Sequence, residues 1–155
     1  MNLIEVVKKY QNKILDDGIL VEYDLFFKED AENGCHFAID EYEELRELDN
    51  VILKIRESDK DAEIYVHTYG VDFSKERIYI YADTIWINTV MNVEEIYSFF
   101  RNLREIEPAD IVVLAEDETI DGPVALVVST EYKVEDYETF IEKRKLSEIQ
   151  SLYWD

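Results

Sequence analysis

The sequence predicts an α+β fold in which about four helices pack mainly on one face of a mostly antiparallel sheet, a meander. Apolar residues recur at helical spacing near both ends of the chain, whereas over Val51–Thr89 they alternate with a period of two. No internal repeat, low-complexity tract or linker rich in Pro, Gly or Ser divides the 155 residues. We therefore expect a single globular domain over residues 1–155.

The first elements follow from the apolar spacing. Asn2–Asp17 carries one helical stripe, and Gly18 is the expected C′ residue, because glycine adopts a left-handed conformation without a Cβ clash. Ile19–Phe27 alternates and is rich in β-branched and aromatic residues, which predicts a strand. Three elements are expected next: a polar turn at Lys28–Gly34, a short strand at Cys35–Ile39, and a charged helix from Asp40 to about Asp49.

The middle of the chain predicts the meander. It would have three or four strands, drawn from Val51–Arg56, Glu63–Tyr69, Arg77–Ala82 and Ile85–Asn88. An acidic turn over Glu57–Asp61 would join the first two strands, and a tight turn near Asp83 and Thr84 would join the last two. One face of this sheet would carry aliphatic side chains against the helices, and the other would carry polar and aromatic ones.

The last third of the chain predicts two helices around a second hairpin. Asn92 and Glu95 form an Asn variant of the capping box at the start of a helix with a buried stripe. Two short apolar runs, Ile111–Ala115 and Val124–Val128, are expected to pair as buried strands. A final helix over 134–145 begins with acidic residues and ends with basic ones, which complements the helix dipole.

The net charge restricts the possible classes of binding partner more than any sequence motif does. There are 37 acidic and 16 basic residues, which gives a formal charge of −21, and 13% of the chain is aromatic. A field of this sign repels nucleic acid and anionic lipid and attracts cationic partners. No apolar run approaches the roughly 20 residues of a membrane span, no signal peptide is visible, and a single Cys fits a reducing compartment, so we expect a cytoplasmic protein.

Catalytic and metal-binding motifs are not found in the sequence. Cys35 and His36 are adjacent, so in a strand they point to opposite faces and cannot form a nucleophile–base pair. The richest carboxylate cluster, Glu116-Asp117-Glu118 with Asp121, lacks the alternating ligand spacing of an EF-hand. We therefore expect no enzymatic activity, no dedicated metal site and no cofactor.

Two surfaces remain as candidates for binding a protein partner. One is the aromatic face of the meander, and the other is the set of acidic loops, which could each be solvated edges. Exposed Tyr and Trp are typical interface anchors, although cross-strand pairing or a second helical layer could also explain this face. The candidate partner-binding residues are Asp59, Asp61, Tyr65, Tyr69, Tyr79, Tyr81, Trp86, Glu116, Asp117, Glu118 and Asp121.

One local pattern resembles a known class of proteins. The segment Ile85-Trp86-Ile87-Asn88-Thr89, followed by Asn92-Val93-Glu94-Glu95-Ile96, is similar to a strand-then-helix pattern of small acidic immunity proteins from bacterial polymorphic-toxin and contact-dependent growth inhibition systems. The resemblance implies a cytosolic protein that binds and neutralises one cognate, basic toxin domain. Two alternatives stay open: a DNA-mimic inhibitor of a nucleic-acid-binding enzyme, or a small enzyme with an unrecognised site.

Overall fold

Eight strands form one mixed, mostly antiparallel sheet in the computed structural model, which describes residues 1–29, 34–74 and 76–155. The sheet order is β5-β8-β4-β3-β1-β6-β7, with β2 also paired to β4. The pairs β1–β6 and β2–β4 are parallel, and the others are antiparallel. The strands are β1 (Gly18–Glu22), β2 (Cys35–Phe37), β3 (Glu63–Asp72), β4 (Tyr79–Asn88), β5 (Asp110–Val113), β6 (Val124–Val128), β7 (Val134–Asp136) and β8 (Ile149–Tyr153).

The described residues also form six α-helices, so the predicted α+β class is confirmed. They are α1 (Leu3–Lys9), α2 (Gln11–Ile14), α3 (Tyr23–Lys28), α4 (Tyr42–Ser58), α5 (Val93–Ser98) and α6 (Tyr137–Glu142), and a short 3-10 turn covers Leu146–Glu148. Helices α1 to α5 contribute to the larger of two apolar cores, whereas α6 packs in the smaller core. No helix in the described ranges has both the length and the apolar character that crossing a bilayer demands.

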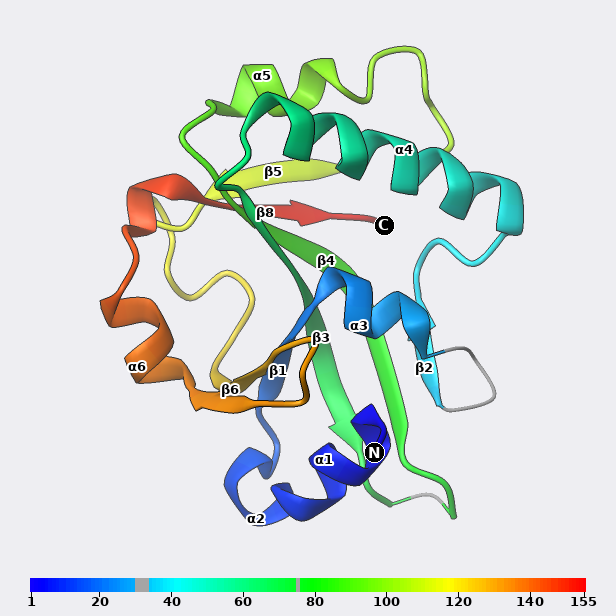
Figure 1. Cartoon of the computed structure of the whole chain (residues 1–155), viewed down its shortest axis with the longest axis vertical. Coiled ribbons are helices and arrows are strands. Elements are labelled where there is room, and N and C mark those ends of the chain that lie inside the picture. The colour runs from blue at the N-terminus through cyan, green and yellow to red at the C-terminus, as the bar shows by residue number, and fades with distance from the viewer. Residues whose placement is uncertain (30–33, 75) are drawn as a thin grey trace.

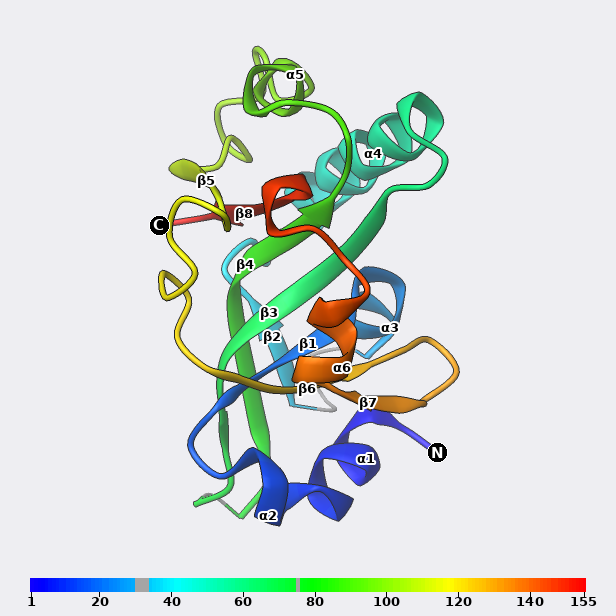
Figure 2. The same ribbon diagram turned by 90° about the vertical axis from the view of Figure 1, so that its left-hand side faces the viewer.

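The antiparallel β3–β4 ribbon is the longest pairing in the sheet. It runs from the end of the molecule near α4 and α5 to the end near α1 and α2 (Figures 1 and 2). Ile64 and Val66 on β3 and Ile85 and Ile87 on β4 point into the larger core, as the alternation predicts. Tyr65 and Trp86, which are directly opposite each other, point into the smaller core.

The first predicted strand of the meander is wrong, because Val51–Arg56 lies inside helix α4. The buried residues of α4 are Leu48, Val51, Ile52 and Ile55, which is the spacing of one helical face. Leu53, which the alternation placed beside Val51 and Ile55, is exposed. The alternation of Val51, Leu53 and Ile55 was therefore a weaker signal than the helical spacing of the buried residues. Of the predicted meander, the β3–β4 ribbon remains.

The predictions for the N-terminal quarter need three corrections. The first helix is two short ones, α1 and α2, interrupted at Tyr10. Gly18 does not end a helix but begins β1, where a Cβ would lie 2.4 Å from the carbonyl oxygen of Thr68. Strand β1 stops at Glu22 and the chain turns into α3, which buries Leu25 and Phe26. The predicted turn at Lys28–Gly34 falls largely on residues 30–33, which lie outside the described residues.

The second predicted hairpin is also wrong. Strand β5 pairs with the C-terminal strand β8, which the sequence analysis did not anticipate, and β6 pairs with β1 and β7. The predicted final helix is divided into β7 and α6. The capping box at Asn92 and Glu95 is confirmed at the start of α5.

Asp83 and Thr84 lie within β4 instead of forming the predicted tight turn. His67 pairs with Thr84 and Thr68 pairs with Ala82, so the register skips Asp83, which is the extra residue of a bulge. A bulge redirects side chains and is common beside functional sites. The two polar residues thus mark a local irregularity in one continuous strand of ten residues.

Helix α6 and the residues just after it cover part of the aromatic face, α6 through Phe140 and the following turn through Arg144. The Phe140 ring meets Tyr65 edge-on at 5.1 Å, and the Arg144 guanidinium lies 3.7 Å from the centre of the Phe140 ring. Arg144 also donates two hydrogen bonds of 2.8 Å to the Glu63 carboxylate. Burial alone would raise the pKa of Glu63, but the hydrogen bonds from Arg144 and Asn88 outweigh it and lower that pKa.

Replacing Arg144 with Ala should lower the free energy of unfolding by about 2 kcal/mol, because a half-buried carboxylate loses its bidentate partner. Arg144→Lys should recover part of this loss. The control is Lys133→Ala, which removes an exposed ion pair of 3.1 Å with Glu131 and should change stability by less than about 0.5 kcal/mol. Equal effects of the two alanine variants in urea denaturation would contradict this role for Arg144.

Candidate functional site

A cavity of about 670 Å³ lies between the aromatic face of the sheet and the loop that joins β5 to β6, residues 114–123. We call it the acidic cavity. The loop supplies Thr119, Ile120 and Asp121 to its lining. The strands supply most of the rest, including Gly18, His67, Tyr69, Asp83, Thr84, Asp110, Ser151 and Tyr153, and Asp16 comes from the connection before β1.

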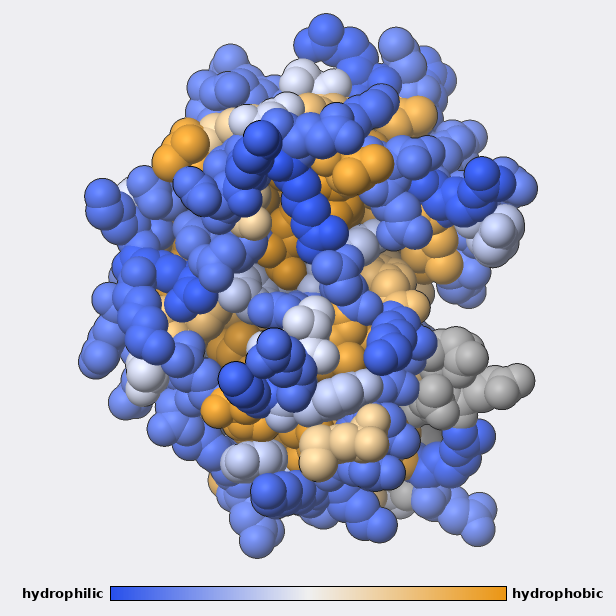
Figure 3. Space-filling view, in the orientation of Figure 1, coloured by the Kyte–Doolittle hydropathy of each residue, from blue (hydrophilic) through white to orange (hydrophobic). Residues whose placement is uncertain are grey.

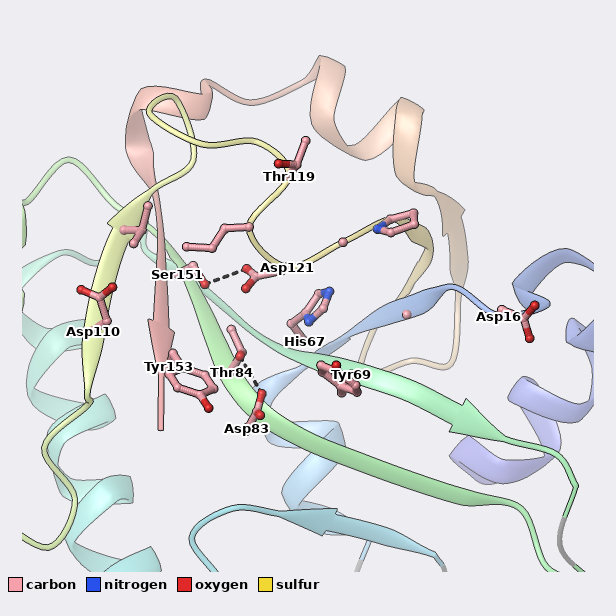
Figure 4. Close-up of a pocket in the computed structure, with 15 residues that line it drawn as sticks. Asp16, His67, Tyr69, Asp83, Thr84, Asp110, Thr119, Asp121, Ser151 and Tyr153 are labelled. Carbon is pink, nitrogen blue, oxygen red and sulfur yellow. Dashed lines mark hydrogen bonds between the residues drawn. The ribbon is translucent and has the colours of Figure 1, made fainter. Parts of the chain in front are cut away.

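The Asp121 carboxylate holds the loop over the sheet. Its Oδ2 atom accepts hydrogen bonds from Trp86 Nε1 at 2.6 Å and from Ser151 Oγ at 2.7 Å. Figure 4 shows Asp121 and Ser151 pointing toward each other, with the His67 ring beside Asp121. Charge-assisted hydrogen bonds of this kind are about twice as strong as neutral ones. Asp121 therefore fixes the roof of the acidic cavity to two neighbouring strands.

His67 is the buried titratable group of the acidic cavity. Its side chain is only 2% exposed and stacks on Trp86, with ring centres 5.5 Å apart and planes at 10°. Its Nε2 atom has no hydrogen-bond partner among the described residues. Burial lowers the pKa of His67, while the charges of Asp121 and Asp83 oppose this shift. The imidazole is thus held neutral near physiological pH, with one ring nitrogen unsatisfied.

Negative charge and exposed aromatic surface meet around the acidic cavity. Four aspartates line it, Asp16, Asp83, Asp110 and Asp121, whereas no Lys or Arg is found among the described residues of the lining. Three lining residues are large, apolar and exposed: Tyr69 at 78%, Ile120 at 43% and Tyr153 at 40%. Asp16 and Asp110 lie at opposite sides of the close-up view, with His67 and Asp121 between them (Figure 4).

The hydrogen bonds of the acidic cavity do not form a nucleophilic triad. Ser151 donates its hydroxyl hydrogen bond to Asp121 and not to His67, so the serine–histidine pair of a nucleophilic triad is not formed among the described residues. Cys35 belongs to the larger core, whereas His67 stacks on Trp86 of the smaller one. Within the described ranges, no three His, Cys, Asp or Glu side chains are arranged to hold a metal ion. The arrangement is suited to recognising a cationic group.

The structure brings only two of the predicted partner-binding residues, Tyr69 and Asp121, to the acidic cavity. Trp86 and Tyr65 are buried beneath α6 and the loop, so they cannot serve as free surface anchors. This outcome matches the alternative in which a second layer covers the aromatic face. Tyr81 is exposed outside the lining, and Tyr79 is half-buried and stacks on His36.

The remaining predicted acidic residues lie elsewhere. Asp59 accepts hydrogen bonds from Thr89 Oγ1 at 2.6 Å and from the Asp61 amide at 3.1 Å, so it ties the end of α4 to the end of β4. The hydrogen bond from Thr89 lowers the pKa of Asp59. Asp61, Glu116, Asp117 and Glu118 are exposed and outside the lining of the acidic cavity. Hydrophilic residues cover much of the face of the molecule that Figure 3 shows, with apolar patches between them.

Several residues of the acidic cavity were missed by the sequence analysis: Asp16, His67, Asp83, Asp110, Ser151 and Tyr153. They come from five separate segments, and one sequence gives no sign that these segments meet. Strand β8, which carries Ser151 and Tyr153, gave no signal either, because its first four residues are all buried and its polar and apolar residues do not alternate.

Protonation of His67 should destabilise the folded protein. The unfolded imidazole titrates near 6.5, and burial lowers the folded pKa. Below about pH 6.5 the unfolded state therefore binds more protons, so the free energy of unfolding falls with falling pH, by up to roughly 1 kcal/mol per pH unit. The matched variant is His67→Gln, which cannot titrate. The difference in unfolding free energy between wild type and this variant should shrink on acidification, and a pH-independent difference would contradict the prediction.

Comparisons with known proteins give a family for the chain. A family model described as the Uncharacterized protein YfbO family matches residues 2–134. This range includes all the residues that line the acidic cavity except Ser151 and Tyr153. No curated protein and no solved structure matched the chain. Because the family model covers most of the sequence, the chain belongs to the YfbO family.

Proposed function

We propose that this protein is a non-enzymatic binding protein that engages a cationic protein partner at the mouth of the acidic cavity. One observation carries the proposal: exposed Tyr69, Ile120 and Tyr153 share a cavity with four aspartates, and its described lining has no Lys or Arg. Tyrosine anchors in a partly desolvated pocket are typical of interface hot spots. The carboxylates would favour a partner whose docking surface is positively charged.

The net charge of −21 supports the same partner class. Opposite charge steers encounter and raises the association rate, while packing of the anchors sets the dissociation rate. In this proposal the role of the protein is that of an immunity protein: it binds one basic toxin domain and covers its active or docking surface. The resemblance of the β4–α5 segment to immunity proteins gives the toxin as the kind of partner to test first.

The test is capture of a partner from cells with the full chain as bait, followed by association kinetics. Wild type should bind a basic protein with an association rate that falls steeply between about 50 and 500 mM salt, since the Debye length shortens severalfold over that range. The double variant Asp16→Asn/Asp110→Asn should slow association. Tyr69→Ala should speed dissociation by about tenfold, which corresponds to the roughly 1.4 kcal/mol of an interface anchor.

The matched control for charge is Glu43→Gln/Glu116→Gln, which removes two exposed acids outside the lining of the acidic cavity. It should slow association less than the Asp16 and Asp110 pair. Equal effects of the two double variants would mean that the association rate depends on net charge alone. That result would contradict docking at the acidic cavity. Where the captured protein is toxic, co-expression of wild type should restore growth and Tyr69→Ala should restore it less.

A further inference from the structure

The acidic cavity contains one feature that binding at its mouth does not explain, the unsatisfied Nε2 atom of His67. This side chain is 2% exposed, and its Nε2 lies close to Gly18, where a Cβ would be 3.4 Å from it. Burying a polar atom without a hydrogen-bond partner is unfavourable, and native structures contain few such atoms. A ligand that supplies the missing hydrogen bond would remove this cost.

We propose that the acidic cavity binds a single guanidinium group, with His67 Nε2 as a neutral hydrogen-bond acceptor at its buried side. The proposal rests on the proposed function, because it identifies the group that a cationic partner inserts, an arginine side chain. In the proposed complex, the neutral imidazole of His67 carries its proton on Nδ1. Its Nε2 atom therefore presents a lone pair to an N–H donor of the ligand.

The sign of the ligand follows from the carboxylates. If the proton were on Nε2 instead, the ligand would have to supply a hydrogen-bond acceptor, such as a carboxylate. Asp83 and Asp121, the two charges that act on His67, would repel such an anion. Asp121 accepts two hydrogen bonds and Asp83 accepts one from Thr84, yet each carboxylate has about four lone-pair positions. Both can therefore accept further N–H donors from a cation.

A guanidinium suits this set of acceptors better than an ammonium does. It presents five N–H donors in one plane, and it also stacks on aromatic rings. The acidic cavity offers acceptors on His67, Asp83 and Asp121, and the tyrosines Tyr69 and Tyr153 line its opening. Its volume of about 670 Å³ is within the range of ligand sites and exceeds what one side chain needs.

Acidification should weaken this binding, because the protonated imidazole loses its lone pair and repels a cation. The titratable groups that line the acidic cavity with His67 are Asp121 on the loop, Asp83 on β4, Asp110 on β5, Asp16 before β1, Tyr69 on β3 and Tyr153 on β8. Burial lowers the pKa of His67 below the usual value of about 6.5, so its imidazole gains a charge only as the pH falls below that value.

The experiment titrates the full-length protein with capped arginine (N-acetyl-arginine methylamide) and follows the His67 imidazole resonances by NMR. Saturable shifts are expected at about neutral pH, and the affinity should weaken as acidification below about pH 6.5 protonates His67. The citrulline analogue, which has the same shape without the charge, should not bind, and the lysine analogue should bind more weakly. Failure of capped arginine to shift His67, or equal binding of the citrulline analogue, would overturn the proposal.

Variants locate the site. Asp83→Asn keeps an acceptor for Thr84 but removes a charge, and it should raise the dissociation constant of capped arginine about tenfold. The control Glu116→Gln removes an exposed charge outside the lining and should leave binding nearly unchanged. His67→Gln should abolish the pH dependence below about pH 6.5. Equal weakening by Asp83→Asn and Glu116→Gln would contradict a site at His67.

Two sources of the guanidinium are distinguished by their context. A Gly-Arg-Gly peptide with capped ends should bind at least as tightly as agmatine if a partner's side chain is the natural ligand, and agmatine should bind much more tightly if a small molecule is. Arginine binding without a cavity-dependent protein partner would refute the proposed function alone. A cavity-dependent partner without arginine binding would refute the guanidinium site alone.

Discussion

The pairing of β3 with β4 is the constraint on which the two cores and the acidic cavity depend. Because side chains alternate along both strands, one face buries Ile64, Val66, Ile85 and Ile87 in the larger core, while Tyr65 and Trp86 pack against α6 in the smaller core. The bulge at Asp83 interrupts this pairing where His67 lies opposite Thr84. At that point the aromatic face is covered by the β5–β6 loop instead of a helix, and a cavity remains.

The carboxylates of this acidic protein fall into two groups. Some carboxylates stabilise the fold by accepting hydrogen bonds, such as Glu63 from Arg144 and Asp121 from Trp86 and Ser151. Others surround the acidic cavity, whose described lining has no Lys or Arg to neutralise them. Repulsion among such charges is reduced when a cation binds between them, and self-repulsion is otherwise a cost of a high net charge. In the proposed function, these carboxylates form part of the surface that binds a cationic partner.

Local signals in the sequence were sufficient for the α+β class, the β3–β4 ribbon and the capping box of α5, because each depends on neighbouring residues. The pairing of β5 with β8 and of β6 with β1 depends on contacts between distant segments, which spacing does not encode. Of the residues that line the acidic cavity, only Tyr69 and Asp121 were among the predicted partner-binding residues, because the lining also comes from distant segments. Trp86 was expected at the surface because nothing local indicated that Asp121 would accept its N–H.

The most direct measurement of the central claim, that a partner docks at the acidic cavity, is site-specific photo-crosslinking in cells. A photoreactive phenylalanine analogue replaces Tyr69, which is 78% exposed and lines the acidic cavity, or Tyr42, which is 72% exposed on α4 and does not line it. The account predicts a cross-linked adduct with one basic protein at position 69 and none at position 42. An adduct at position 42 alone, or equal adducts at both positions, would contradict it.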